Sequence, residues 1–352
     1  MEHITTLGID LAKNVFQLHG LNAMQKTVLK KKLSRDALLP FIAKLSPCLI
    51  GMEACASAHY FAKQFQAMGH TVKLMSPQYV KPYVKTSKND AKDAEACAEA
   101  VTRPNMRFVS IKTDTQCELQ SIHRIRTHFV KEKTSLMNMI RGLLAEWGIA
   151  IPKREGSLKR KLEELTELEN GSLNINMKEL MTDLYESLKT IFSKVDNYTK
   201  QIKALSKKDP LCCRLETIPG VGPIISTALV AKIGNGAEFS SGRGLSAFLG
   251  LVPKQNSSGG VEKLSGITKH GDRYLRYLLI HGGRSCAKAV LEKKKGTDSY
   301  KKEDPHSAWV RELIMRCGKN KTAVAIANKN ARIAIALLKS GEDFNPATAH
   351  SY

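Results

Sequence analysis

The chain has 352 residues, 42% of them hydrophobic and 25% charged, which is enough for two or three domains with buried cores. Lys and Arg number 55 against 33 Asp and Glu, and the formal net charge is +22 at pH 7. Such an excess disfavours a merely soluble protein and favours one that holds a polyanion. No run approaches the roughly 18 apolar residues of a membrane span, and the chain opens on a strand-like run rather than a signal peptide. We therefore expect a cytoplasmic, nucleoid-associated protein with no membrane partner.

The cysteines and histidines show no pattern of a metal or redox site. Eight cysteines include no C-x-x-C pair, and none of the ten histidines has a ligand spacing relative to them. We expect buried thiols in a reducing compartment.

The first hundred residues alternate between strand and helix patterns. Strands are expected over residues 4–10, 14–20, 26–32, 48–52 and 71–75, and helices over residues 34–45, 58–68 and 89–101. Ser34 is the expected N-cap of the first helix. The short link between the first two strands predicts that they pair antiparallel. Residues 1–104 are thus predicted to form an α/β domain.

Beyond Pro104 the pattern is helical. Residues 115–147 carry apolar side chains at helical intervals. A second stripe follows the a/d rhythm of a coiled coil through Leu184, Leu188, Ile191, Val195, Tyr198, Ile202 and Leu205. Two long helices, joined by a polar stretch containing Asn170-Gly171, are expected to form an antiparallel hairpin over residues 105–210. This hairpin either protrudes and joins subunits into a dimer or tetramer, or it is one more amphipathic helix on a globular core.

The third region, residues 211–352, opens on a glycine turn between two short helices. The run from Leu215 to Pro223 contains Pro219-Gly220-Val221-Gly222 and is followed by an apolar helix. It resembles the helix-hairpin-helix motif of DNA-binding proteins, in which backbone N–H groups at a helix N-terminus contact phosphate without reading a base. An ordinary helical turn is the alternative. We expect Gly220, Val221 and Gly222 to bind nucleic acid.

Four carboxylates are placed where the first domain gathers them. Asp10 ends the first strand and Glu53 ends a later one, while Asp90 and Asp93 share one face of a helix at a spacing of three. Each alone is typical of a solvated surface. Together, in so basic a chain, they predict a site for Mg²⁺ or Mn²⁺, because oxygen ligands suit hard cations and the metal would offset their repulsion of phosphate. The pattern favours metal-dependent chemistry on nucleic acid.

Two groups of motifs resemble one insertion-sequence transposase family, which includes the pilin-gene invertases and the bridge-RNA-guided recombinases. Gly8-Ile9-Asp10, Gly51-Met52-Glu53 and K-x-D-x-x-D-A over residues 88–94 resemble its RuvC-like, ribonuclease-H-fold domain. F-L-G-L-V-P at 248–253, Ser257-Ser258-Gly259-Gly260 and G-I-T-K-H-G-D-R-Y-L-R at 266–276 resemble its second domain. The resemblance covers about residues 4–104 and 211–290.

The resemblance implies DNA recombination through a serine nucleophile. The acidic tetrad would be Asp10, Glu53, Asp90 and Asp93, completing the active site, and the nucleophile would be Ser257, with the adjacent Ser258 left open. The basic residues Lys263, Lys269, Arg273 and Arg276 would hold the scissile phosphate. The partners would be donor and target double-stranded DNA and a guide RNA, with the helical hairpin used for assembly. Base pairing would then supply specificity while the protein contacts the backbone.

Two other functions fit part of the pattern. A structure-selective nuclease would use the four carboxylates for metal-dependent hydrolysis with no covalent intermediate. A non-catalytic architectural protein would bind DNA through the glycine turn and the basic surface alone. A trapped covalent protein–DNA adduct separates the recombinase from the nuclease, and any metal-dependent strand scission excludes the architectural protein.

Overall fold

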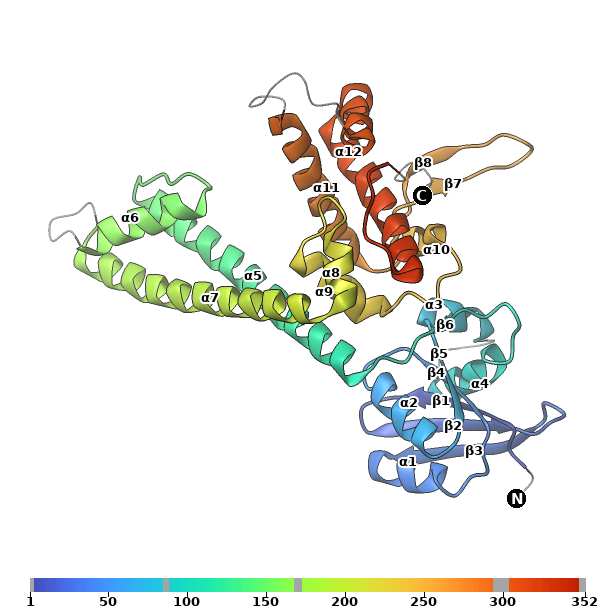
Figure 1. Ribbon diagram of the computed structural model, residues 1–352. Coiled ribbons are helices and arrows are strands. Elements are labelled where there is room, and N and C mark those ends of the chain that lie inside the picture. Colours follow the sequence, from blue (N-terminus) through green and yellow to red (C-terminus); the bar gives the residue numbers. More distant parts are fainter. Residues whose placement is uncertain (1–2, 85–88, 168–172, 294–303, 348–352) are drawn as a thin grey trace. The chain divides into compact units, whose positions relative to one another are not determined.

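The computed structural model describes residues 3–84, 89–167, 173–293 and 304–347 (Figure 1). The chain divides into two compact units, Met1–Thr113 and Asp114–Tyr352. The helical region and the C-terminal region, which the sequence suggests as separate domains, belong to one unit. In the described part of the chain, no helix combines the length and the apolar character needed to cross a membrane.

A six-stranded mixed sheet forms the centre of the first unit, in the order β3-β2-β1-β4-β5-β6. Its strands are β1 (Thr6–Leu11), β2 (Val15–Leu21), β3 (Thr27–Ser34), β4 (Leu49–Glu53), β5 (Thr71–Met75) and β6 (Phe108–Val109). The strands β1 to β3 pair antiparallel, β4 and β5 run parallel to β1, and β6 pairs antiparallel with β5. The five expected strands are confirmed, with the antiparallel first pair, and β6 is additional. This sheet is compatible with the expected ribonuclease-H-like fold.

The helices of this unit are α1 (Arg35–Ile42), α2 (Ala58–Ala67), α3 (Pro77–Val80), the 3₁₀ turn η1 (Lys81–Tyr83) and α4 (Asp90–Ala100). The three expected helices are confirmed to within a few residues. Ser34 lies at the N-cap position of α1, but its side chain makes no capping hydrogen bond. Asn89 caps α4, accepting a hydrogen bond from the Ala91 N–H.

Side chains along each strand point alternately to the two faces of the sheet, and different helices cover these faces. Leu7, Ile9 and Ile50 are fully buried and pack in one core with side chains of α1 and α2, including Leu38 and Phe61. The residues between them, which point to the other face, include two glycines that α4 covers. The sheet therefore lies between α1 and α2 on one side and α4 on the other.

Glycine is required where α4 meets the sheet. A Cβ on Gly8 would lie 2.1 Å from the Ala94 carbonyl oxygen, and one on Gly51 would lie 2.9 Å from the Cys97 carbonyl oxygen. These clashes involve backbone atoms, so α4 would have to move away from β1 and β4 to admit any side chain. The alanines along this helix give the same close approach, since Ala94 and Ala98 are fully buried.

The second unit begins with a long helical hairpin. It consists of α5 (Asp114–Glu146), α6 (Glu155–Glu167) and α7 (Ile175–Lys208). Arg126 donates a hydrogen bond to Thr199, and Phe129 stacks on Tyr198. Residue numbers therefore increase along α5 while those of the facing α7 residues decrease. This is the expected antiparallel pair, with α6 folded at its tip (Figure 1). The Asn170-Gly171 link lies outside the described residues.

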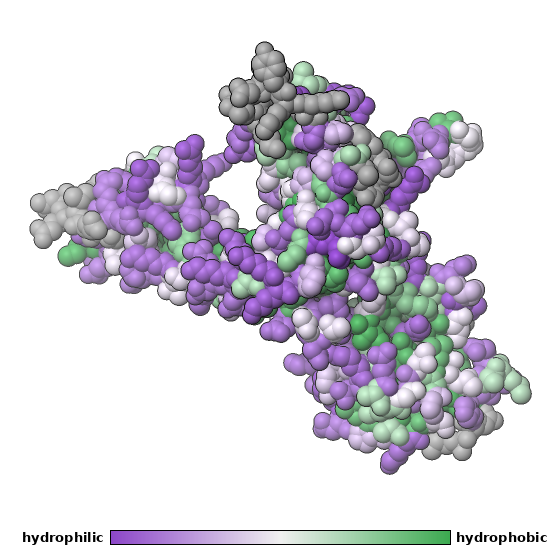
Figure 2. Space-filling view, viewed as in Figure 1, coloured by the Kyte–Doolittle hydropathy of each residue, from purple (hydrophilic) through white to green (hydrophobic). Residues whose placement is uncertain are grey.

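The a/d stripe of α7 is covered within one protomer. Leu188, Ile191, Val195 and Ile202 are each less than a tenth exposed, and α7 packs against α5, α6, α8 and α9 of the same chain. Most of the visible outer surface of the hairpin is hydrophilic (Figure 2). The buried positions of the stripe are therefore not available to a partner subunit, and an assembly role of the hairpin as a whole stays a prediction.

The C-terminal part is mostly helical. It contains α8 (Pro210–Glu216), α9 (Pro223–Ile233), α10 (Gly242–Phe248), α11 (Arg273–Lys293) and α12 (Pro305–Ser340), the last kinked at Gly318. A two-stranded hairpin, β7 (Pro253–Gln255) and β8 (Leu264–Ile267), projects from these helices (Figure 1). Apolar residues of α8 to α12 form one core cluster. The C-terminal part is thus a helical core that presents one hairpin.

Candidate functional site

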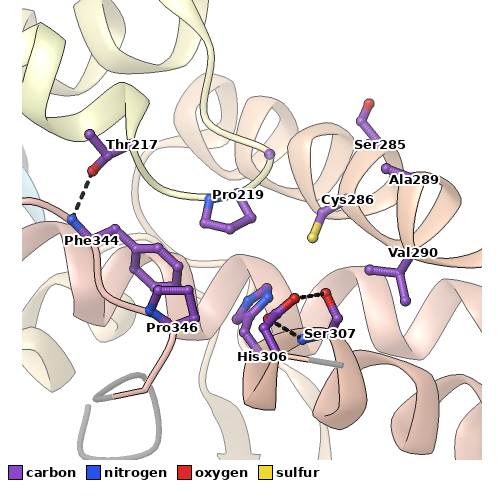
Figure 3. A pocket seen from close by; sticks show the side chains of 12 residues that line it. Thr217, Pro219, Ser285, Cys286, Ala289, Val290, His306, Ser307, Phe344 and Pro346 are labelled. Atoms are coloured by element: carbon purple, nitrogen blue, oxygen red, sulfur yellow. Dashed lines mark hydrogen bonds between the residues drawn. The ribbon is translucent and has the colours of Figure 1, made fainter. Parts of the chain in front are cut away.

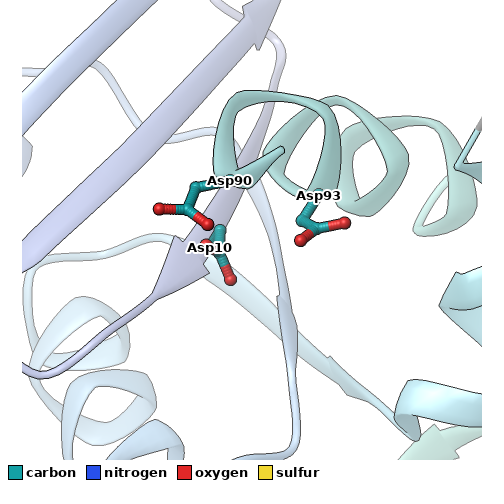
Figure 4. Close-up of side chains that lie close together, drawn as sticks. All are labelled: Asp10, Asp90 and Asp93. Carbon is teal, nitrogen blue, oxygen red and sulfur yellow. The ribbon is translucent and has the colours of Figure 1, made fainter. Parts of the chain in front are cut away.

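Three of the four predicted carboxylates converge in the first unit. One carboxylate oxygen from each of Asp10, Asp90 and Asp93 lies within 4.8 Å of the others (Figure 4). Asp10 comes from β1, and the other two come from the first turn of α4. A donor set of carboxylate oxygens alone fits a hard divalent cation such as Mg²⁺ or Mn²⁺. The group is therefore a candidate metal centre.

The packing of α4 explains this convergence. Gly8 and Asp10 lie two residues apart on β1 and so point to the same face, the face that α4 covers. The contact at Gly8 draws the helix onto the strand, and its N-terminal turn then lies over Asp10. The positive end of the helix dipole also favours the charges of Asp90 and Asp93.

Glu53 lies at the end of β4, beside this group but outside the set of three. Gly51 and Glu53 repeat on β4 the spacing of Gly8 and Asp10 on β1. Burial and then the negative charges of Glu53, Asp10 and Asp93 raise the pKa of the thiol of Cys97, a buried residue of α4. Glu53 therefore shares the electrostatic environment of the other three.

The candidate serines lie at the tip of the β7–β8 hairpin. Ser257 and Ser258 are exposed, and the Gln255 side-chain amide donates a 3.0 Å hydrogen bond to the Ser257 hydroxyl. Ser258 bridges to Val261 across Gly259 and Gly260, whose φ angles are +57° and +78°. Two consecutive positive φ angles define a tight hairpin turn that strongly favours glycine. The two glycines of the Ser257-Ser258-Gly259-Gly260 motif thus build the turn beside the serines.

Two of the C-terminal motifs lock together at the base of this hairpin. A Cβ on Gly250 would lie 2.2 Å from the His270 carbonyl oxygen, and one on Gly271 would lie 1.8 Å from the Phe248 carbonyl oxygen. The Thr268 N–H donates to the Val252 carbonyl. The F-L-G-L-V-P and G-I-T-K-H-G-D-R segments therefore form one rigid support for an exposed hairpin.

The four predicted phosphate-binding cations have different environments. Lys263, Lys269 and Arg273 are exposed near or below the serine loop. Arg276 instead donates through Nη1 to the carbonyls of Leu249 and His270, at 3.0 Å each. This gives Arg276 a structural role, because it holds the two interlocked loops together.

Asp272, in the same motif, is a helix cap. Its Oδ1 accepts from the N–H groups of Tyr274 and Leu275 at the start of α11, and its Oδ2 lies 3.4 Å from the Lys232 ammonium. These contacts position Arg273, the first residue of the helix, at the edge of the hairpin base.

The glycine turn packs inward more than the helix-hairpin-helix resemblance suggests. Gly220 has a φ of +86°, and a Cβ there would lie 2.4 Å from the Gly282 carbonyl of α11. Val221 is buried. Open space remains at Gly222, before α9. The turn lines a cavity of about 630 Å³ with residues of α11, α12 and the C-terminal segment (Figure 3). Gly220 and Val221 thus have packing roles, and Gly222 remains the position open to a ligand.

Two sets of polar contacts inside the second unit were not found from the sequence. Asn328 of α12 donates to the Leu251 carbonyl, and Asn330 donates to the Pro219 carbonyl. The buried His123 ring of α5 contacts the Tyr274 and Thr227 hydroxyls at 3.0 and 2.9 Å. Each contact joins residues more than 70 positions apart, and no local pattern marks such pairs. The sequence signal is an Asn-Lys-Asn run inside the mostly apolar second half of α12.

Comparisons with known proteins agree with this architecture. The family model described as Transposase IS116/IS110/IS902 family matches residues 212–299, and a transposase model of the IS110 DEDD group matches residues 7–148. The first match contains the serine hairpin, and the second contains all four acidic residues. The two matches therefore fall on the two candidate sites.

Two relatives that match almost the whole chain are named as transposases, and a third relative matches part of it. A probable family 20 transposase of Pseudomonas aeruginosa is 41% identical over 98% of this chain and 99% of its own. The transposase for insertion sequence element IS1111A of Coxiella burnetii is 40% identical over 98% of this chain and 92% of its own. The pilin gene-inverting protein of Moraxella bovis is 24% identical over 60% of this chain and 58% of its own. With its acidic cluster, its serine hairpin and these full-length matches, the chain belongs to the IS116/IS110/IS902 family of transposases.

Proposed function

We propose that this protein is the recombinase of an insertion sequence, which cuts and rejoins donor and target DNA through a covalent bond to Ser257. The observation that carries the proposal is the convergence of Asp10, Asp90 and Asp93 in a chain of net charge +22. Carboxylates this close repel each other and phosphate alike, and the close packing of α4 on Gly8 holds them together, which supports a cation-dependent role.

The acidic residues would hold Mg²⁺ or Mn²⁺, with Glu53 as the fourth ligand. When bound, such an ion neutralises phosphate charge and stabilises the oxygens that attack and leave. The residues of the chain supply the position: β1 and β4 present Asp10 and Glu53, and α4 fixes Asp90 and Asp93 above them. A shift of α4 away from the sheet would therefore displace two of the four ligands, Asp90 and Asp93, together.

Ser257 would attack the DNA phosphate through its hydroxyl oxygen. The new Oγ–P bond replaces a P–O bond of the strand, the departing strand oxygen ends as a hydroxyl, and the number of phosphoester bonds is unchanged. Rejoining then needs no external energy source. The exposed hairpin suits this step, since Ser257 is accessible while the base of the hairpin is held rigidly.

Cations near the hairpin would neutralise the charge that develops on the phosphate. Lys263, Lys269 and Arg273 are exposed and suit this role. Arg276 would contribute through the loops that it holds. Gly222, at the N-terminus of α9, offers backbone donors to a second phosphate.

A guide RNA would supply sequence specificity, and the protein would assemble as a homo-oligomer. The support is the large positive charge without a helix that the sequence marks as a base reader. Since the α7 stripe is covered within the protomer, the subunit contact would use another surface.

Recombination between donor and target plasmids tests the proposal. Purified wild-type protein with Mg²⁺ and its RNA should recombine them, and Ser257→Ala should lower the product by at least about 10³-fold, since the nucleophile is lost. Ser265→Ala, an exposed serine on β8 of the same hairpin, is the matched control and should recombine normally. Ser258→Ala should have a mild effect. Wild-type recombination by Ser257→Ala, or by protein without RNA, would contradict the respective part of the proposal.

A further inference from the structure

A second, smaller pocket lies in the first unit, away from the acidic cluster. It has a volume of about 280 Å³ and is formed by residues of α3, η1 and the segment that leads into β6. Tyr79, Tyr83, Arg103, Asn105 and Arg107 contribute to its lining. This volume is at the lower limit for ligand pockets, so it suits a group the size of one ring system.

The pocket combines aromatic faces with guanidinium groups. Tyr79 is 37% exposed, and the Arg103 guanidinium lies 5.8 Å from the centre of the Tyr83 ring. Arg103 also pairs with Glu99 across one turn, which leaves Arg107 as an exposed cation at the rim. Asn105 adds an amide that both donates and accepts hydrogen bonds. Flat apolar surfaces, cations and one amide together match a nucleotide.

Further aromatic and basic groups continue this surface. Phe108 of β6 is 36% exposed, and the Lys73 ammonium of β5 lies 5.3 Å from the centre of its ring. Lys81 of η1 is also exposed. Alternating cations and aromatic rings are typical of surfaces that follow a single strand, where bases stack and phosphates meet positive charge.

We propose that this pocket binds an unstacked base of a single-stranded nucleic acid, with Tyr79 as the stacking platform and Arg107 on the adjacent phosphate. The inference rests on the proposed function, since it assumes that nucleic acid is the ligand. The pocket and the acidic cluster adjoin opposite ends of α4, which is on the order of 15 Å long at 1.5 Å per residue. The pocket thus anchors a strand a short distance from the acidic site. Double-stranded nucleic acid is excluded from the pocket, because a base that is paired and stacked in a duplex cannot enter it.

Fluorescence anisotropy on the full-length protein tests this pocket. The probes are labelled 12-nucleotide oligo(U) and oligo(dT), with a 12-base-pair duplex for comparison, all in EDTA so that the acidic residues bind no metal. Tyr79→Ala should weaken single-strand binding by about tenfold or more, the loss expected for one stacked base, and leave duplex binding unchanged. Tyr79→Phe should bind normally, and Tyr79→Leu, which keeps apolar bulk, should behave like Tyr79→Ala.

Two further variants sharpen the result. Tyr60→Ala removes another exposed tyrosine of the same unit, which lies outside the pocket, and should have no effect. Arg107→Gln should reduce the slope of log affinity against log salt by about 0.7 for single strands. A greater Tyr79-dependent loss for oligo(U) identifies an RNA strand as the preferred ligand, a greater loss for oligo(dT) identifies a displaced DNA strand, and equal losses show that the pocket accepts either.

The assay is independent of the serine chemistry. Ser257→Ala should bind every probe as the wild type does, so a failed recombination proposal leaves this binding result standing. Unchanged single-strand affinity in both Tyr79→Ala and Tyr79→Leu would overturn the inference, as would equal losses for single strands and duplex.

Discussion

At the residue scale, the acidic group is marked as a cation site by the close approach of its negative charges. Asp10, Asp90 and Asp93 bring their oxygens within 4.8 Å of one another, an arrangement that is costly without a cation. The sequence predicted these residues because each is placed at a strand end or on one helix face. It could not predict that Glu53 stands slightly apart, since that depends on how closely α4 sits on two strands.

We expect Asp93→Asn to separate metal binding from folding. Asn keeps the shape of Asp but removes the charge that holds a hard cation, so the variant should lose Mn²⁺ binding in calorimetry and lose recombination. Its melting temperature in EDTA should equal or exceed that of the wild type, because like-charge repulsion is relieved. Metal should raise the melting temperature of the wild type only.

Asp36→Asn, an exposed acid of α1, is the control and should bind Mn²⁺ normally. Full recombination by Asp93→Asn would refute a metal role for the group.

The buried His123 predicts a pH dependence of stability. Burial, and to a lesser degree the Arg126 charge, lowers the pKa of His123 from 6.5 to about 4. The Thr227 hydroxyl donates to the Pro223 carbonyl, so its oxygen accepts from the ring, and the other ring nitrogen accepts from the Tyr274 hydroxyl. A neutral ring with one proton satisfies both contacts.

Between about pH 6.5 and pH 4 the unfolded chain therefore binds a proton that the folded chain does not. The free energy of unfolding should fall as pH falls through this window, by an amount on the order of 3 kcal/mol from this residue. Above about pH 6.5 the ring is neutral in both states, and His123 causes no such loss. Urea denaturation of the wild type and of His123→Gln at several pH values measures it. The difference between the two proteins should shrink toward pH 4, and a difference that is constant with pH would contradict this account.

At the element scale, the sequence predicts elements well where their apolar pattern is local. The strand at Thr71–Met75 is found at the residues expected, and the other early elements differ by a few residues at their ends. The β7–β8 hairpin could not be predicted as a strand pair, because Pro253 and its neighbours are exposed and carry no apolar alternation. The loops that support it are interlocked by glycines distant in sequence, and only the folded chain shows this contact.

The α7 stripe shows where periodicity alone is ambiguous. An a/d rhythm requires a covering helix but does not say which chain supplies it. Ile202 is fully buried, so Ile202→Lys buries a charge, and we expect a loss of about 3–5 kcal/mol in the free energy of unfolding with an unchanged mass in light scattering. Leu180→Lys, on the same helix but 57% exposed, is the control and should change neither. A lower mass for Ile202→Lys without loss of stability would restore the intersubunit interpretation.

At the scale of the whole molecule, the excess of 22 positive charges should dominate affinity for nucleic acid. Each phosphate contact releases counterions, so the slope of log affinity against log salt should be about −0.9 per contact for duplex DNA. Several contacts predict a steep fall between low and physiological salt, measured by anisotropy with a fixed duplex. An affinity independent of salt would show that the positive charge does not form the binding surface.

The central claim is that Ser257 becomes covalently joined to DNA. The most direct measurement is peptide mapping by mass spectrometry of an adduct trapped on a nicked substrate that prevents rejoining. The account predicts a nucleotide attached to Ser257, present in the wild type with Mg²⁺ and lost in Ser257→Ala and Asp93→Asn. Attachment at Ser258 would move the nucleophile by one residue, and DNA cleavage with no adduct at all would contradict the claim and favour a hydrolytic nuclease.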